Sequence, residues 1–224
     1  MDIHAPHQPV HSWRDFFTHI VIITIGLFLA LMLEAGVDWL HHKHIVREAR
    51  ENIHTELESN HKAMQQNIAD LSTNLDQMKT NIRTINLLRS HSPGKNFSLS
   101  YNMRFSNPSE AAWRTARDTG ALAYMPYSEV QGYADLYAIQ SDLNQQANVV
   151  GQHEFALLAP TQMGLNFEQL PPAEFDTMLH GSAASLLEIC AFRQQVEELD
   201  QLYDAQLGAD TKNAKIDPCS NLMQ

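Results

Sequence analysis

The stretch LEAGVDWLHHKH, residues 33–44, brings together side chains that could hold a metal ion or a proton. On a helix, Glu34, Asp38 and His41 follow one another at steps of four and three residues, so they share one face. Carboxylates and imidazoles in this arrangement can ligate a metal, and His42 adds a further ligand beside them. Two carboxylates four residues apart also repel each other, which favours a retained proton or a bridging cation. These four residues are candidate ligands of a metal or redox centre.

The same stretch follows directly on an uncharged apolar run, which favours a second interpretation. The run FFTHIVIITIGLFLALML, residues 16–33, contains no Asp, Glu, Lys or Arg. A helix of this length covers about 27 Å, close to the roughly 30 Å hydrocarbon core of a bilayer. Trp13 and Trp39 flank the run, at depths where interfacial tryptophans are expected. We therefore predict a transmembrane helix over residues 16–40, with HHKH as its polar collar.

A cleaved signal peptide and the core helix of a soluble domain are the alternatives for this segment. Leucine at the −3 position of the candidate cleavage site LEA argues against cleavage, and the uncharged length argues against a soluble core. Within the helix, Gly26 and Ala30 form a small-xxx-small pair that allows helices to approach closely in lipid. Glu34 would lie near that contact, so Gly26, Ala30 and Glu34 are candidate partner-contact residues.

A long helix is predicted to continue beyond the membrane, over residues 41–90, because no Pro or Gly occurs between residues 37 and 92. Its apolar residues follow the alternating four-three steps of a coiled coil or bundle helix: Met64, Ile68, Leu71, Leu75, Met78, Ile82 and Ile85. The Asn, Gln, Glu, Lys and Thr residues between them are expected to face solvent. A bend or break is expected near His61, where the apolar pattern is weakest.

Residues 91–108 are predicted to form an extended loop. Pro93-Gly94 marks a turn, after which Phe97, Leu99, Tyr101, Met103 and Phe105 alternate with polar residues. We expect this loop to lay its apolar side on the helices; a short hairpin or an intermolecular strand is the alternative.

A helical bundle is predicted over residues 109–208. Its first helix is capped by Asn107 or Ser109, and Gly120 marks either the end of this helix or a tight contact. The next helix begins near Pro126 and runs to about Leu158, and the last begins at Pro172 and ends at Gly208. Pro160 is expected to mark the connection between the last two.

Polar pairs within the predicted bundle do not form a catalytic constellation. His153 with Glu154, and His180 with Asp176, are expected to face solvent, because polar helix faces supply such pairs routinely. Trp113 and Arg117 could line a pocket, or the tryptophan could be buried beside an ion pair; both residues are candidate partner contacts.

Composition excludes several classes of function. A formal net charge of −11 and a pI near 5.4 argue against nucleic-acid binding, which needs a basic face. The sequence contains no Walker loop, no GxGxxG and no CxxC. Cys190 and Cys219 are too few for a disulfide scaffold, and are either two inert thiols or one disulfide. We expect neither a cofactor nor an enzymatic activity.

Four segments resemble, in the same order, a group of uncharacterised bacterial single-pass membrane proteins: HAPHQPVHSWRDF, ITIGLFLALMLE, WLHHKHIVREARENI and AWRTARDTGALAYMPYSEV. The resemblance covers roughly half of the chain and carries no established activity. It implies an N-terminal anchor in the bacterial inner membrane with a helical domain on the periplasmic side. The positive-inside rule points the other way, because Lys43, Arg47 and Arg50 follow the anchor whereas Arg14 alone precedes it.

These features predict an all-α protein: one N-terminal transmembrane helix continues into a long coiled-coil-like helix, and a helical bundle with one extended loop follows. Flexible or loose polar tails are expected over residues 1–15 and 209–224. The favoured function is non-enzymatic: a membrane-anchored scaffold or accessory subunit of a larger membrane complex, whose partners are the lipid bilayer and other membrane proteins or a second copy in a homodimer. The alternatives are a sensor with a ligand pocket in the bundle, and a metal or redox site at the membrane edge.

Overall fold

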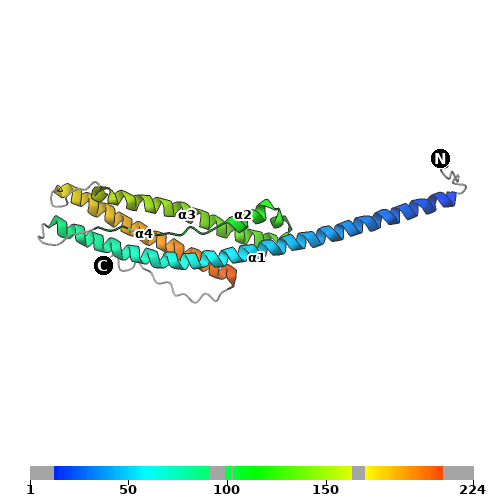
Figure 1. Cartoon of the computed structure of the whole chain (residues 1–224), viewed down its shortest axis with the longest axis horizontal. Helices are drawn as coiled ribbons and strands as arrows, with labels where there is room; N and C mark the ends of the chain where they lie inside the picture. Colours follow the sequence, from blue (N-terminus) through cyan, green and yellow to red (C-terminus); the bar gives the residue numbers. More distant parts are fainter. Residues whose placement is uncertain (1–12, 91–98, 102, 163–169, 209–224) are drawn as a thin grey trace, which may run out of the picture. The chain divides into compact units, whose positions relative to one another are not determined.

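The computed structural model describes residues 13–90, 99–101, 103–162 and 170–208, without the side chains of residues 158–162. These residues form α1 (Trp13–Arg89), α2 (Ala111–Asp118), the 3-10 helix η1 (Ala121–Tyr124), α3 (Tyr127–Gln162) and α4 (Pro172–Leu207) (Figure 1). The described ranges contain no β-strand, so the predicted all-α fold is confirmed. The predicted C-terminal tail, most of the N-terminal tail, the turn at Pro93-Gly94 and Phe97 lie outside the described residues.

The chain divides into two compact units, residues 1–48 and 49–224. In the first unit, the described residues all belong to the N-terminal part of α1. An 18-residue window of this helix is long and apolar enough to cross a membrane, and none of the window is buried. Large apolar side chains such as Phe16, Ile23 and Leu33 are exposed. The N-terminal part of α1 therefore has the length and surface that a membrane anchor requires.

In the second unit, α1 and α3 run in parallel. The Arg50 guanidinium donates two hydrogen bonds to Glu129, at 2.7 and 2.6 Å, across a separation of 79 residues. Asn74 donates to Glu154 across a separation of 80 residues. Because this separation stays nearly constant along both helices, the two advance in the same direction and in register.

Helix α4 runs antiparallel to α1 and α3. His61 of α1 contacts Asp204 near the C-terminal end of α4, whereas Arg89 at the end of α1 forms an ion pair of 3.0 Å with Asp176 near its start. The three long helices thus form a bundle around a shared core (Figure 1). The largest fully buried side chains come from all three: Ile53, Leu57, Met64, Leu71, Met78, Ile85, Val150, Ile189, Phe192, Leu199 and Tyr203.

The predicted apolar pattern of α1 is confirmed, because its residues are buried or half-buried from Met64 to Ile85. They pack in a core shared with α3 and α4 of the same chain. The break expected near His61 is wrong, since α1 is helical throughout. Asn60 is buried and His61 is largely buried. At this point of α1, polar residues therefore take the place of apolar residues on the side of the helix that faces the core.

Residues 99–101 and 103–110 form the extended segment predicted from the alternating pattern, without becoming a strand. Leu99, Tyr101, Met103 and Phe105 are half-buried, and Ser100, Arg104 and Ser106 are exposed. Positive φ values of 77° at Gly120 and 74° at Gly208 confirm the two predicted helix ends, because this backbone conformation favours glycine. The end predicted for α3 is wrong: this helix passes Pro160 and ends at Gln162.

Candidate functional site: a polar seam in the bundle

Four asparagines follow one another at intervals of seven residues on α1, and we call them the asparagine ladder: Asn60, Asn67, Asn74 and Asn81. Seven residues are nearly two helical turns, so all four lie on one face of the helix. None of them is more than 4% exposed. The prediction that the asparagines of this helix face solvent is therefore wrong for these four, which lie in the core beside the apolar pattern.

Three of these asparagines bind the backbone of the extended segment. In each case the side-chain amide donates to the carbonyl of one residue and accepts the N–H of the same residue. The donated and accepted bonds are 2.8 and 2.8 Å between Asn60 and Ser109, 2.9 and 2.8 Å between Asn67 and Ser106, and 2.6 and 3.2 Å between Asn81 and Ser100. The asparagine amide thus takes the place of a neighbouring strand for backbone groups that need partners.

The repeat of the ladder matches the repeat of an extended chain. Seven residues of α-helix rise about 10.5 Å, and three extended residues cover roughly 10 Å. The step from Asn60 to Asn67 therefore corresponds to the step from Ser109 back to Ser106, with the extended segment running antiparallel to α1. Asn74, one step further along α1, donates instead to Oε1 of Glu154 on α3 at 2.7 Å.

Glu56 lies one helical turn before Asn60 and extends the row of buried polar residues that the asparagine ladder forms on α1. Its Oε2 accepts hydrogen bonds from Ser109 Oγ at 2.7 Å and from the Ala112 N–H at 2.9 Å, and its Oε1 accepts one from the Tyr137 hydroxyl at 2.7 Å. A carboxylate of α1 thus binds an otherwise unpaired amide in the first turn of α2. Burial and the hydrogen bond to Glu56 both raise the pKa of the Tyr137 hydroxyl, which keeps it a donor.

The first turn of α2 differs from the predicted cap. Glu110 occupies the N-cap position and its side chain makes no capping hydrogen bond. Ser109, one of the two predicted caps, accepts the Ala111 N–H on its Oγ at 3.2 Å. Gln140 of α3 also donates to the Ser109 carbonyl at 2.9 Å and accepts the Tyr203 hydroxyl of α4 at 2.6 Å. Ser109 is therefore the point where the extended segment contacts both α1 and α3.

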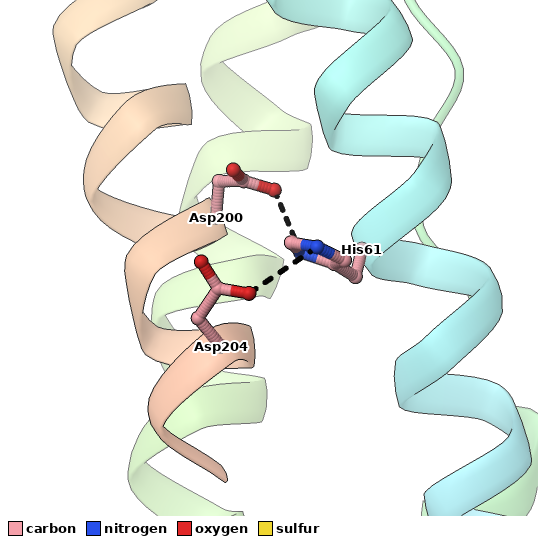
Figure 2. Close-up of side chains that lie close together, drawn as sticks. All are labelled: His61, Asp200 and Asp204. Carbon is pink, nitrogen blue, oxygen red and sulfur yellow. Dashed lines mark ion pairs between the residues drawn. The ribbon is translucent and has the colours of Figure 1, made fainter. Parts of the chain in front are cut away.

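A second polar group joins α1 to α4 and consists of His61, Asp200 and Asp204 (Figure 2). The imidazole Nδ1 lies 2.9 Å from Asp200 Oδ1, and Nε2 lies 3.3 Å from Asp204 Oδ1. The two aspartates stand one helical turn apart, so both can face the same imidazole. Gln65 adds a side-chain amide nitrogen 2.8 Å from His61 Nε2. The pKa of the Asp200 carboxyl is raised, chiefly by burial and further by the charge of Asp204, while the neighbouring His61 opposes this rise.

Glu154 is a third buried carboxyl, 2% exposed. Burial raises its pKa, the hydrogen bond from Asn74 opposes that shift, and the charge of Glu188 adds to it. Its Oε2 is buried without a hydrogen-bond partner among the described residues. The prediction that His153 and Glu154 face solvent is confirmed for His153, which is exposed and lies 2.9 Å from Glu188 of α4, and is wrong for Glu154.

The metal ligands proposed at the membrane edge are not brought into a cluster. Glu34, Asp38 and His41 are exposed and His42 is half-buried. Within the described ranges, the one group of three or more potential metal ligands with all ligand atoms within 4.8 Å of one another is His61, Asp200 and Asp204.

The candidate partner contacts have different environments. Gly26, Ala30 and Glu34 are exposed, and a Cβ atom built on Gly26 would meet no other group within 4 Å. Trp113 stacks on Tyr137 at 5.4 Å between ring centroids. Arg117 is exposed and donates to Asp118 at 3.1 Å.

Comparisons with protein-family models, with curated proteins and with solved structures find no match to this chain. The candidate site must therefore be interpreted from its own geometry. The seven-residue period of the asparagines was visible in the sequence and could have identified the ladder. The partners of His61 could not be found in this way, because they lie on a different helix far along the chain.

Proposed function

We propose that this chain is a non-enzymatic, single-pass membrane protein whose helical bundle binds other proteins, as a scaffold or accessory subunit of a larger membrane complex. The observation that carries this proposal is the fully exposed apolar window in the N-terminal part of α1. In water, exposed apolar surface costs free energy in proportion to its area, and a hydrocarbon environment removes that cost. The bilayer is therefore the partner of this segment.

The interior of the bundle supports a structural role for its polar groups. The ladder asparagines and Glu56 form their hydrogen bonds with the extended segment, α2 and α3. Buried polar pairs of this kind favour one register of packing over its alternatives. A bundle with one fixed register presents a constant surface, which suits a protein that assembles with others.

We place the anchor in the bacterial inner membrane and the bundle in the periplasm. Cys190 is buried on α4 and is not a free thiol, which supports an oxidising compartment; Cys219 lies outside the described residues. Protease added to intact spheroplasts tests this placement. Degradation of the bundle without lysis supports the periplasmic side, and protection until lysis assigns the bundle to the cytoplasm.

Purification of the full chain from its native membranes in mild detergent tests the main proposal. We expect a native mass larger than that of a monomer, with either a second copy or defined co-purifying membrane proteins. Exchange of both Gly26 and Ala30 for Ile should weaken an association made within the lipid, because bulky side chains prevent close helix approach. Gly36→Ile is the matched control, since Gly36 is exposed on the same helix outside this pair. A monomer without any co-purifying protein would contradict the proposal.

A further inference from the structure

We propose that His61, Asp200 and Asp204 form a binding site for one divalent transition-metal ion, of the zinc or manganese type, that joins α1 to α4 within the bundle. This site is distinct from the membrane-edge histidines and goes beyond the proposed scaffold function.

The ligand set suits such an ion. One imidazole nitrogen and two carboxylate oxygens are ligands found in zinc sites, and carboxylates with an imidazole also suit manganese. The two carboxylates come from one face of α4 and the imidazole comes from α1, as Figure 2 shows. An ion held by all three would therefore connect two helices that meet only through side chains.

The distances are close to those that a metal ion requires. In a tetrahedral site with bonds of about 2.0–2.1 Å, the ligand atoms lie roughly 3.3 Å from one another. The imidazole Nδ1 lies 2.9 Å from Asp200 Oδ1, whereas the contact of 3.3 Å with Asp204 Oδ1 is made by the other ring nitrogen, Nε2. One ligand atom from each of the three residues fits within a span of 4.8 Å. Binding of one ion through a single imidazole nitrogen therefore requires one of the two carboxylates to rotate toward the nitrogen that the other already contacts.

The closest contact in this cluster is an ion pair rather than a well-aligned hydrogen bond. His61 Nδ1 and Asp200 Oδ1 are buried 2.9 Å apart, and neither atom has a hydrogen-bond partner of good geometry among the described residues. Asp200 itself is 7% exposed, so water does not readily replace the missing bond. A cation bound between these two atoms would give each of them the partner that it lacks.

The surroundings allow the site to be loaded and oriented. The side chains of His61 and Asp204 are 17% and 15% exposed, which leaves an edge open to solvent. Gln65 lies beside the imidazole Nε2 on the same helix. With its amide oxygen turned to accept the Nε2–H, Gln65 would orient the ring for metal binding through Nδ1, as outer groups do for metal-bound histidines.

Metal analysis of the full chain in detergent tests the site. The protein is purified with a histidine-free affinity tag, treated with a chelator, incubated with Zn²⁺ or Mn²⁺, desalted and analysed for metal per chain. The same samples are heated to measure Tm. We expect about one retained ion per chain and a rise in Tm of roughly 5 °C or more at saturating metal.

The chain contains 12 histidines, so a retained ion could be bound elsewhere. Variants of the proposed ligands therefore test where it binds. His61→Ala and Asp204→Asn should lose the retained ion and the metal-dependent rise in Tm. Asp204→Asn preserves side-chain shape, so its far-UV circular dichroism should remain that of the wild type. His153→Ala is the matched control, because His153 also faces a carboxylate between two helices but is 59% exposed. It should retain the ion.

Three results would overturn the inference. One is no retained ion in the wild type with either metal. Another is an equal amount of retained ion in Asp204→Asn and the wild type. The third is loss of the ion in a His41→Ala, His42→Ala double variant but not in His61→Ala, which would assign it to the membrane edge. None of these results depends on whether the bundle binds a protein partner.

Discussion

The side-chain amide of Asn67 pairs with both backbone polar groups of Ser106. Its Nδ2 donates to the Ser106 carbonyl at 2.9 Å, and its Oδ1 accepts the Ser106 N–H at 2.8 Å. Asn67 is fully buried, so this pairing takes place inside the bundle. The extended segment is therefore held to α1 by hydrogen bonds to its backbone. Bonds of this kind do not depend on which side chain residue 106 carries.

Replacement of Asn67 by Ala should destabilise the bundle. The substitution leaves the N–H and the carbonyl of Ser106 without their partner, which costs about 2 kcal/mol or more of unfolding free energy. Urea unfolding of the full chain in detergent, followed by circular dichroism, measures the loss. Asn86→Ala is the control: Asn86 is exposed on the same helix and bonds back to its own backbone at Ile82, so we expect a change within about 0.5 kcal/mol. Equal losses in both variants would show that burial of the ladder has no energetic consequence.

Glu56 and Tyr137 should be energetically coupled. Glu56→Gln weakens an acceptor that serves Ser109, Ala112 and Tyr137, and Tyr137→Phe removes one donor to it. Because the two changes remove one shared hydrogen bond, the double variant should be more stable than the sum of the single losses predicts, by about 1–2 kcal/mol. Urea unfolding of the four proteins measures this coupling. Additive losses would mean that the Tyr137 bond contributes nothing.

Ionisation of Glu154 should destabilise the bundle. Burial raises the pKa of this carboxyl above its ordinary value of 4.5, so the folded state binds its proton more tightly than the unfolded state does. The contribution of this group to stability is therefore fullest at low pH, and it falls as pH rises from about 4.5 through the raised pKa. Glu154→Gln cannot ionise and keeps an oxygen to accept from Asn74. We expect Glu154→Gln to be more stable than the wild type at pH 7 and to lose this part of the pH dependence.

Thermal unfolding between pH 4 and pH 8 measures this difference. Glu198→Gln is the matched control, since Glu198 is an exposed carboxyl and should leave the pH profile unchanged. A Glu154→Gln profile parallel to that of the wild type would contradict the role assigned to Glu154.

A charge within the apolar window should reduce membrane integration. Ile25 is exposed near the middle of the uncharged run. Ile25→Arg adds about 2.5–3.5 kcal/mol to the apparent free energy of insertion. Carbonate extraction of membranes should therefore release more of this variant than of the wild type. His44→Arg, beyond the apolar run, should be retained as well as the wild type. Full extraction of the wild-type chain would argue against an integral anchor.

Local patterns in the sequence were sufficient for the long helices, for the two helix ends marked by glycine and for the extended segment. The apolar steps from Met64 to Ile85 predicted the buried side of α1, and Gly120 and Gly208 predicted helix ends, because periodicity and glycine conformation are properties of neighbouring residues. The exposed apolar run near the N-terminus is likewise read directly from composition and length.

The polar groups of the core were decided by the tertiary structure. Asparagine is usually exposed, so the sequence predicts that the ladder residues face solvent. They are buried because the extended segment offers them backbone hydrogen-bond partners at matching intervals. His61 was expected to mark a break in α1 because its neighbours along the chain offer no apolar contact. Its partners, Asp200 and Asp204, come from α4, and they approach it only because α4 folds back antiparallel to α1. Sequence periodicity thus determined which residues lie on each helix face, while the packing of distant helices determined which polar side chains meet.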